Sequence, residues 1–356
     1  MKKILKILLI LILVIIAALA LLLGWLTVTE FKPAPVEAAA ITRSGDNYTL
    51  TDGDRLRILC WNVGFGGLGK AEDSFLDGGT KAKPDSREVV HAYLEGICNT
   101  IAGKEPDLVL LQEVDVDSAR TYGIDEREIL SRDMSCETFA LNYSCPFVPV
   151  PMPPMGKVNG GLYTMTNGLL IERAERVSLP CPFSWPLRIA NLKRCMLVSW
   201  LPIEGSEKKL VLVNFHLEAY SEEEGKLAQM KQLCDVITAE YEKGNYVVAG
   251  GDFNMAFPGS LEVYPNEHTE NWIPGELDMS LLPEGWGLAY DLTVPSCRLL
   301  NQPYDPADAA GTQHYVIDGL IVSPNVAPDS VATLDLGFEH SDHNPVLLEL
   351  VLDKAA

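Results

Sequence analysis

Basic residues are scarce in this chain of 356 residues. Lysine and arginine total 28 against 49 aspartates and glutamates, which gives a formal net charge of −21. When Lys2, Lys3 and Lys6 are set aside with the apolar N-terminal stretch, 25 basic residues face 49 acidic ones, or −24. A surface with this much negative charge repels polyanions at long range and disfavours tight, non-specific binding of long DNA. A phosphate substrate remains compatible with it if a metal cation lies in the site.

Several common motifs are absent. No two cysteines have C-x-x-C zinc spacing, no internal repeat occurs, and no P-loop lysine follows Gly250 and Gly251. We expect these two glycines to serve close backbone packing. Cys60 and Cys195 fall in apolar, strand-like runs and Cys234 on the apolar face of a predicted helix, and all three are expected to be buried free thiols. Disulfide pairing among the remaining cysteines stays open, because an exported chain can form disulfides: Cys98, Cys136, Cys145, Cys181 and Cys297.

Charged side chains are missing from Ile7 to Leu26. As a helix, this stretch spans about 30 Å, the thickness of a hydrocarbon core. The lysines before it predict a single-pass anchor with a cytoplasmic N-terminus and an extracytoplasmic globular part. A cleaved signal peptide is the alternative, with Val36–Ala40 as a small-residue cleavage site, but its apolar region is normally only about 7–15 residues long. We therefore divide the chain into a stub and anchor (1–29), a linker (30–54) and one globular domain (55–353).

Apolar, strand-like runs that end in polar residues recur along this domain. Charge at the end of a buried strand is unfavourable unless the charged groups meet a common partner. The runs, each with its polar residues, are 56–62 with Asn62, 107–115 with Glu113, 209–217 with His216, 246–254 with Asp252 and Asn254, 315–323 with Asp318, and 338–350 with Asp342 and His343.

Two amphipathic helices are predicted between these strands, over 86–101 and 222–243. Asp85 or Ser86 is the expected N-cap of the first, and a Ser221–Glu224 capping box that of the second. The alternation indicates a mixed α/β fold with helices covering a sheet. Proline-rich 145–156 and most of 255–312 are expected to be surface loops.

The polar strand ends suit metal-assisted phosphoester hydrolysis. Mg²⁺ prefers oxygen ligands, which Glu113, Asp342 and the amide of Asn62 supply. Imidazoles suit proton transfer and phosphate binding instead. Hydrolysis also needs a base for the attacking water and help for the leaving oxygen. The residues available for these tasks are Asp252, Asn254, His216 and His343, with Asp318 able to fix the tautomer of His343.

The ordered motifs "WN", "LQEV", "NFHL", "GGDFN", "IDGLIVS" and "SDHNP" resemble the endonuclease/exonuclease/phosphatase superfamily over about residues 55–352. This superfamily includes DNase I-like nucleases, inositol polyphosphate 5-phosphatases and neutral sphingomyelinases. The resemblance, to a membrane-anchored, bacterial-type member, implies a four-layer α/β/β/α sandwich. It also implies phosphoester hydrolysis that depends on Mg²⁺ or Mn²⁺, with one or two ions.

The resemblance assigns a role to each motif residue. Glu113 matches the main metal-binding glutamate, with Asn62 and Asp342 beside it. Asp252 matches the aspartate that orients or activates the attacking water, while Asn254 and His216 match residues that contact the phosphate. His343 resembles the essential histidine that pairs with an aspartate, here Asp318. The mid-chain motif departs from the family pattern, because Leu162 stands where an asparagine is common.

Each of these residues also has a structural interpretation. Asp252 and Asn254 occur in ordinary turns, His216 fits a core histidine, and Arg194, a candidate phosphate contact, fits a structural arginine, as Arg298 does. Four histidines are expected at the surface: His91, His268, His314 and His340.

Three substrate classes stay open: nucleic acid, a phospholipid head group, as for a sphingomyelinase-like phosphodiesterase, and a small phosphoester. A catalytically silent, membrane-tethered binding module is the alternative from another functional class. Nothing in the sequence implies a protein partner.

Overall fold

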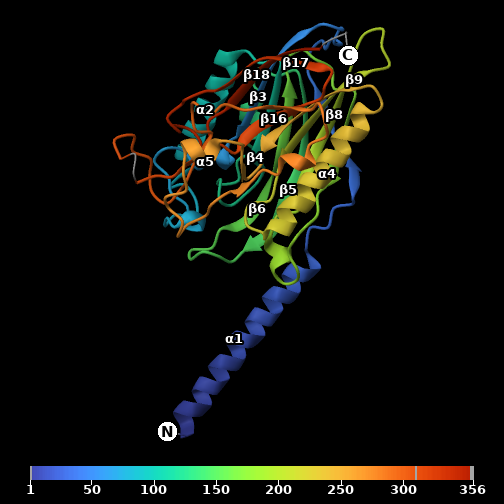
Figure 1. Cartoon of the computed structure of the whole chain (residues 1–356). Helices are drawn as coiled ribbons and strands as arrows, with labels where there is room; N and C mark the ends of the chain where they lie inside the picture. The colour runs from blue at the N-terminus through green and yellow to red at the C-terminus, as the bar shows by residue number, and fades with distance from the viewer. Residues whose placement is uncertain (1, 309–310, 353–356) are drawn as a thin grey trace.

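The computed structural model describes residues 2–308 and 311–352. Two seven-stranded sheets pack face to face, with a long helix on the outer face of each (Figure 1). The mixed α/β class and the four-layer arrangement expected from the sequence are therefore confirmed. Residue 1, the start of the anchor segment, and residue 353, the end of the expected globular domain, lie outside the described residues.

Each sheet combines parallel and antiparallel neighbours. In spatial order the first sheet contains β1 (Val36–Ala38), β7 (Arg173–Ser178), β8 (Cys195–Pro202), β9 (Lys209–His216), β10 (Tyr246–Asp252), β16 (Asp318–Val322) and β13 (Gly287–Ala289). The second contains β17 (Val326–Thr333), β18 (Val346–Leu352), β3 (Arg55–Asn62), β4 (Leu108–Asp115), β6 (Gly156–Thr166), β5 (Cys136–Val148) and β2 (Ile41–Arg43).

The central strands are apolar on both faces because both faces are covered. Ile58 and Leu110 of the second sheet meet Leu212 and Val248 of the first in the core between the sheets. The alternate residues point outward and pack beneath the helices. The predicted strand positions agree with β3, β4, β9 and β10 to within about two residues at the ends that carry the polar side chains. The run over 338–350 agrees less well, because β18 begins only at Val346, and Asp342 and His343 lie in the loop before it.

Helix α2 (Arg87–Lys104) covers the second sheet, where Leu94 and Ile97 pack on Leu59 and Leu111. Its N-cap is Ser86, whose hydroxyl accepts a hydrogen bond from the Val89 amide, as predicted.

Helix α4 (Glu223–Tyr241) covers the first sheet through Met230, Leu233 and Ile237. The predicted capping box is wrong. The Ser221 hydroxyl donates to the Glu222 carbonyl, and the N-cap residue is Glu222, with no side-chain cap.

The proline-rich segment is only partly a loop. Strand β5 continues to Val148, and Pro146 lies at an irregularity in its pairing with β6, where a missing amide hydrogen is tolerated. The predicted strand over 315–323 is shorter, because His314–Tyr315 forms β15 and pairs with β14, so that β16 begins at Asp318.

Short elements interrupt the remaining loops, including the 255–312 region. They are η1 (Gly64–Gly66), η2 (Phe75–Asp77), α3 (Arg127–Leu130), η3 (Leu187–Ala190), β11 (Met255–Ala256), α5 (Ser260–Val263), β12 (Gly275–Glu276), η4 (Met279–Leu281), β14 (Cys297–Arg298) and β15 (His314–Tyr315).

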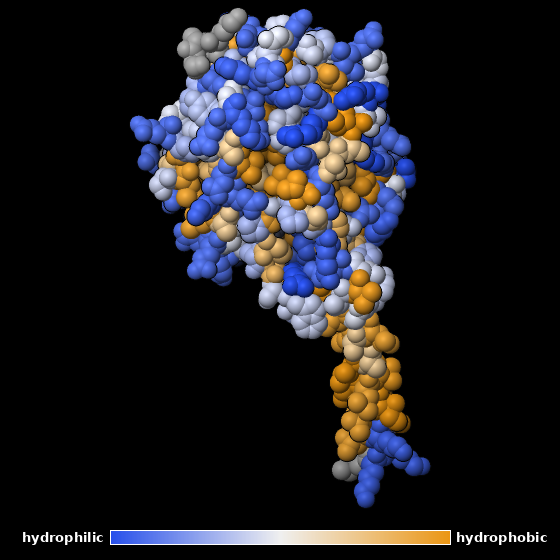
Figure 2. All heavy atoms as spheres, turned by 90° about the vertical axis from the view of Figure 1, so that its right-hand side faces the viewer, coloured by the Kyte–Doolittle hydropathy of each residue, from blue (hydrophilic) through white to orange (hydrophobic). Residues whose placement is uncertain are grey.

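Helix α1 (Lys2–Val28) projects from one end of the domain (Figure 1). Its surface is apolar along most of its length, with hydrophilic side chains at the far end (Figure 2). Among the described residues it is the one helix whose length and composition would allow it to cross a membrane; a signal sequence would have the same properties. The domain surface in Figure 2 is largely hydrophilic.

The segment interpreted as a linker is not a free tether. Strand β1 pairs with β7 at the edge of the first sheet, and β2 pairs with β5 at the edge of the second. Glu30 accepts from Arg188 Nε at 3.0 Å and lies 3.3 Å from Lys193 Nζ. Residues 30–43 are thus fixed to the domain, because their backbone and charged groups find partners on it.

All eight cysteines are free thiols, and seven of them are buried. Cys60, Cys195 and Cys234 are among the buried ones, as expected from their apolar surroundings.

Candidate active site

The polar strand ends converge because of strand register. In the first sheet β9 and β10 run parallel, with His216 opposite Asp252, and antiparallel β16 places Asp318 on the other side of Asp252. In the second sheet β3 ends at Asn62, which pairs with Gln112 of parallel β4, so that the next residue of β4, Glu113, lies beside this end. The two sheets bring these ends to one place, since Asn62 Nδ2 donates to Asp252 Oδ2 at 3.1 Å across the sandwich.

His343 and Asp318 form a buried pair. His343 Nδ1 lies 2.8 Å from Asp318 Oδ2, which also accepts from Ser296 Oγ at 2.8 Å. Burial, the largest single effect, would lower the pKa of His343, but Asp318, Cys297 and Asp342 together outweigh burial, and the pKa lies well above the ordinary value. Nδ1 therefore carries a proton, and Nε2 faces Asp252 at 3.7 Å and Asp342 at 3.9 Å.

Asp252 is the central carboxylate. Its Oδ1 accepts from the Asn254 amide at 2.8 Å, and its Oδ2 lies 3.4 Å from His216 Nε2. Burial, followed by the charge of Asp318, raises the pKa of Asp252 to about 7. A carboxylate with this pKa exchanges a proton near neutral pH, as a general base must.

His216 presents a free nitrogen to the site. Its Nδ1 is buried without a hydrogen-bond partner within the described parts of the chain, and lies 3.9 Å from Glu113 Oε1. Burial, together with nearby Arg194, lowers the pKa of His216 well below its ordinary value. The imidazole is thus neutral, and Nδ1 is available to a water or an oxygen atom of a ligand.

The acidic side of the site fits a hard divalent cation. Burial raises the pKa of Asp342 to about 6, and the charge of Glu113 adds to this effect. Asn62 Nδ2 donates to Glu113 Oε1 at 3.1 Å and fixes that carboxylate. A cation between the two carboxylates would relieve their repulsion with the oxygen ligands that Mg²⁺ and Mn²⁺ prefer.

Backbone strain also marks this position. Glu113 has φ 56°, at an irregularity where β4 leaves its register with β6. A non-glycine residue in this region persists only where its surroundings enforce it, and such residues concentrate at functional sites. Asn254, with φ 51°, is the second case in the site.

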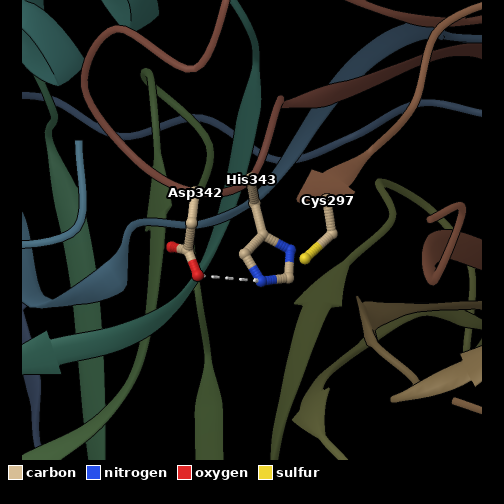
Figure 3. A group of neighbouring side chains, drawn as sticks. All are labelled: Cys297, Asp342 and His343. Atoms are coloured by element: carbon tan, nitrogen blue, oxygen red, sulfur yellow. Dashed lines mark ion pairs between the residues drawn. The ribbon is translucent and has the colours of Figure 1, made fainter. Parts of the chain in front are cut away.

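Among the described residues, two groups of histidine, cysteine and aspartate have ligand-like spacing: Asp252, Asp318 and His343, and the group drawn in Figure 3, Cys297, Asp342 and His343. Neither group suits a metal as well as the carboxylates of Glu113 and Asp342 do. His343 Nδ1 and Asp318 are already bonded to each other, and burial raises the pKa of Cys297 to about 12, so that its sulfur stays protonated. A thiol in this state is a poor ligand.

The two candidate arginines are buried. The Arg194 guanidinium contacts Glu218 Oε2 at 3.3 Å and donates to the His216 carbonyl at 3.2 Å, which positions β9 at its end. Its role in substrate binding stays a prediction. Arg298 donates to four backbone carbonyls and is structural, as the sequence analysis expected.

Asn254, also predicted to contact substrate, donates its side-chain amide to the Leu217 carbonyl at 2.9 Å. That hydrogen bond fixes the Asn254 side chain, which lines the cavity just beyond the ends of β9 and β10.

A single cavity of about 550 Å³ connects most of the predicted site residues. Asn62 and Asp318 lie behind its wall and orient the others. The lining residues predicted from the sequence are Glu113, Arg194, His216, Asp252, Asn254, Asp342 and His343. Their convergence agrees with the sequence analysis, while their catalytic roles stay a prediction.

Sequence analysis missed two residues of the site. Asp77 of η2 lines the cavity, and burial followed by the charge of Asp342 raises its pKa to about 7. Ser296 holds Asp318 and also accepts from the amides of Ile317 and Asp318. Both residues lie in loops without periodicity, and no motif marks them.

Solved structures share this fold. An endonuclease/exonuclease/phosphatase from Beutenbergia cavernae is 18% identical, with a TM-score of 0.55, and the match covers 85% of this chain and 72% of the other. One from Bacteroides vulgatus is 17% identical, with a TM-score of 0.52 and coverage of 84% and 100%. ANGEL2, a 2′,3′-cyclic phosphatase, is 15% identical, with a TM-score of 0.51 and coverage of 89% and 99%.

Among curated protein sequences no match to this chain is found. A sequence profile of the Endonuclease/Exonuclease/phosphatase family, however, matches residues 59–343, a range that contains every motif quoted above except the last two residues of "SDHNP". The chain belongs to the Endonuclease/Exonuclease/phosphatase family.

Proposed function

We propose that this protein is a divalent-metal-dependent phosphoester hydrolase. Members of its family hydrolyse phosphoesters, and the observation that carries the proposal is the arrangement of three side chains on one cavity, one of them held by a fourth behind the wall. Asp252 has a pKa near 7, His343 is held by Asp318, and His216 points an unpartnered nitrogen inward.

In this proposal Glu113 and Asp342 hold Mg²⁺ or Mn²⁺, with Asn62 orienting Glu113. The bound cation would neutralise charge on the phosphoryl oxygens and the leaving oxygen. The number of ions, one or two, belongs to the same proposal.

The chain's own residues carry the proton transfers. Asp252 takes a proton from the attacking water, whose oxygen bonds to phosphorus while one P–O ester bond breaks. His343, protonated and fixed by Asp318, stabilises the phosphoryl oxygens, and His216 and Asn254 contact them from the other side. The leaving oxygen ends as an alcohol after it takes a proton, so that the products are an alcohol and a phosphate with one ester bond fewer.

We further propose that α1 anchors the protein in a membrane, with the N-terminus in the cytoplasm and the catalytic domain outside. This follows from the apolar length of α1 and the lysines at its free end. The division proposed above into 1–29, 30–54 and 55–353 remains, although the middle segment packs on the domain.

The test is hydrolysis of bis-p-nitrophenyl phosphate by the full-length protein in detergent. Turnover should disappear in EDTA and return with added Mg²⁺ or Mn²⁺. Turnover that persists in EDTA would contradict the metal assignment. If no turnover occurred with this compound, DNA, phosphoinositide or sphingomyelin, a silent binding module on the same scaffold would be the better explanation.

A further inference from the structure

The cavity has two ends of different chemistry. One end carries the carboxylates and histidines of the site. The other is apolar and includes side chains from three separate parts of the chain: Leu23 and Leu26 of α1, Met155 before β6, and Ile189 of η3. A phosphate ester that filled this cavity would be polar at one end and apolar at the other.

The apolar end lies where α1 leaves the membrane in the proposed topology. If Ile7–Leu26 fills a hydrocarbon core of about 30 Å, Leu23 and Leu26 lie at its outer boundary. The helix is fixed to the domain there, because Glu30 bonds Arg188 and Trp185 Nε1 donates to Thr27 Oγ1 at 3.1 Å. The cavity therefore opens at the level of the lipid acyl chains.

Exposed apolar side chains gather at the same end of the domain. Met152 is 85% exposed, Leu187 66%, Val150 57% and Leu76 53%; three of the four, Leu187, Val150 and Leu76, also line the cavity. Trp185, 51% exposed beside α1, suits the membrane–water boundary. Exposed apolar groups that cluster in this way mark an interaction surface, and beside a membrane helix the partner is lipid.

We propose that the apolar end of the cavity binds an acyl chain of a membrane phospholipid and that the substrate is this lipid's phosphoester. The inference rests on the proposed function and names its substrate class. Water would add to the lipid phosphorus, one P–O ester bond would break, and the leaving oxygen would take a proton, giving an alcohol and a phosphate monoester. A cavity of about 550 Å³ is within the usual range for sites that bury most of a ligand, about 300–1,000 Å³.

The test uses full-length protein in nanodiscs of phosphatidylcholine that contain phosphatidylcholine with a diazirine in one acyl chain. After illumination, mass spectrometry maps the adducts. We expect adducts on Met155 and Ile189, which are only 8% and 5% exposed and thus shielded from the bulk bilayer. Adducts confined to α1 and to the exposed rim would overturn the proposal.

Two rim variants, Leu76→Glu and Leu187→Glu, place a carboxylate at the apolar end. Both residues are exposed, so the fold should tolerate them, and neither belongs to the catalytic set. Adducts on Met155 and Ile189 should fall about tenfold, because a desolvated carboxylate opposes an acyl chain. Val263→Glu, at an exposed valine away from the cavity, is the matched control and should leave adducts unchanged.

Hydrolysis of bis-p-nitrophenyl phosphate, measured on the same samples, separates this inference from the proposed function. Turnover without adducts on Met155 and Ile189 would support the proposed hydrolase activity but contradict the lipid substrate. Adducts without turnover would support a lipid-binding site but contradict the proposed hydrolase activity. Adducts on Met155 and Ile189 that persist in both rim variants would overturn the assignment of the apolar end.

Discussion

At the residue scale, the imidazole of His343 lies between Asp318 on one side and Asp252 and Asp342 on the other. Only Asp318 is close enough to hydrogen-bond, at 2.8 Å, and it fixes the proton on Nδ1. This leaves Nε2 directed toward the cavity. The pair therefore sets both the orientation and the charge of the group that would meet the phosphoryl oxygens.

Asp318→Asn removes that charge and keeps the shape. We expect kcat to fall about 10²–10⁴-fold, the usual contribution of a positioned proton-transfer group. Because Asp318 raises the pKa of His343, its loss lowers that pKa. In the wild type kcat should decline as pH rises and His343 deprotonates. In the variant this decline should occur at lower pH. The measurement is a kcat–pH profile, with exposed Asp329→Asn as the control. An unchanged profile would exclude the pair from the mechanism.

Glu113→Gln tests the cation side of the site. The amide retains one oxygen ligand but loses the charge. We therefore expect the Mg²⁺ concentration that gives half-maximal activity to rise about tenfold or more. A Mg²⁺ titration of turnover is the measurement. Glu95→Gln changes an exposed glutamate paired with Arg132 and should leave the titration in place. Equal titrations for both variants would contradict the assignment of Glu113.

At the scale of elements, Arg298 of β14 joins two loops that border the site. Its guanidinium donates to the carbonyls of Gly69 and Glu72 in one loop and of Leu299 and Gln302 in the other.

Arg298→Met removes every guanidinium donor and leaves buried carbonyls without these hydrogen bonds. We expect the free energy of unfolding to fall by about 3 kcal/mol, since each such group costs about 1–3 kcal/mol. Denaturant unfolding measures it, with Arg55→Met, at an exposed arginine, as the reference. Equal midpoints for the two variants would show that these bonds contribute little.

The strands that carry the site were predictable, and the outer strands were not. Strands β3, β4, β9 and β10 are continuous apolar runs that end in polar groups, a pattern local to each segment. In β5, by contrast, Asn142, Ser144 and Pro146 interrupt the alternation, and the strand forms because β6 pairs along its length. Edge strands β1 and β2 are three residues each and exist only through distant partners.

The site divides in the same way. Residues at the ends of predictable strands were found from the sequence, including Asn62, Glu113, His216 and Asp252. Asp77, which lines the cavity from η2, and Ser296, which holds Asp318, were missed because their positions depend on tertiary contacts, such as the hydrogen bond from the Ser74 amide to the Leu300 carbonyl. The apolar end of the cavity was equally hidden, since it forms only when α1, η3 and the β5–β6 connection meet.

At the scale of the whole molecule, charge and anchor act together. The domain outside the proposed membrane span carries a formal charge of −24, with 25 basic against 49 acidic residues. A soluble polyanion approaching the cavity meets this field, whereas a lipid already in the bilayer reaches the apolar end by lateral diffusion. The negative charge of the domain therefore disfavours nucleic acid as a substrate without affecting access of a membrane lipid.

This contrast predicts an unusual salt dependence for DNA. A short DNA duplex should inhibit hydrolysis of bis-p-nitrophenyl phosphate only weakly, and its inhibition constant should fall as NaCl rises from 10 to 150 mM at constant Mg²⁺. Screening shortens the Debye length from about 30 Å to about 8 Å and so reduces the repulsion. Proteins that neutralise DNA phosphates behave in the opposite way, because added salt weakens their binding. Inhibition that weakened steeply with salt would reveal a basic DNA-binding groove on this acidic protein, and nucleic acid would then replace lipid as the favoured substrate.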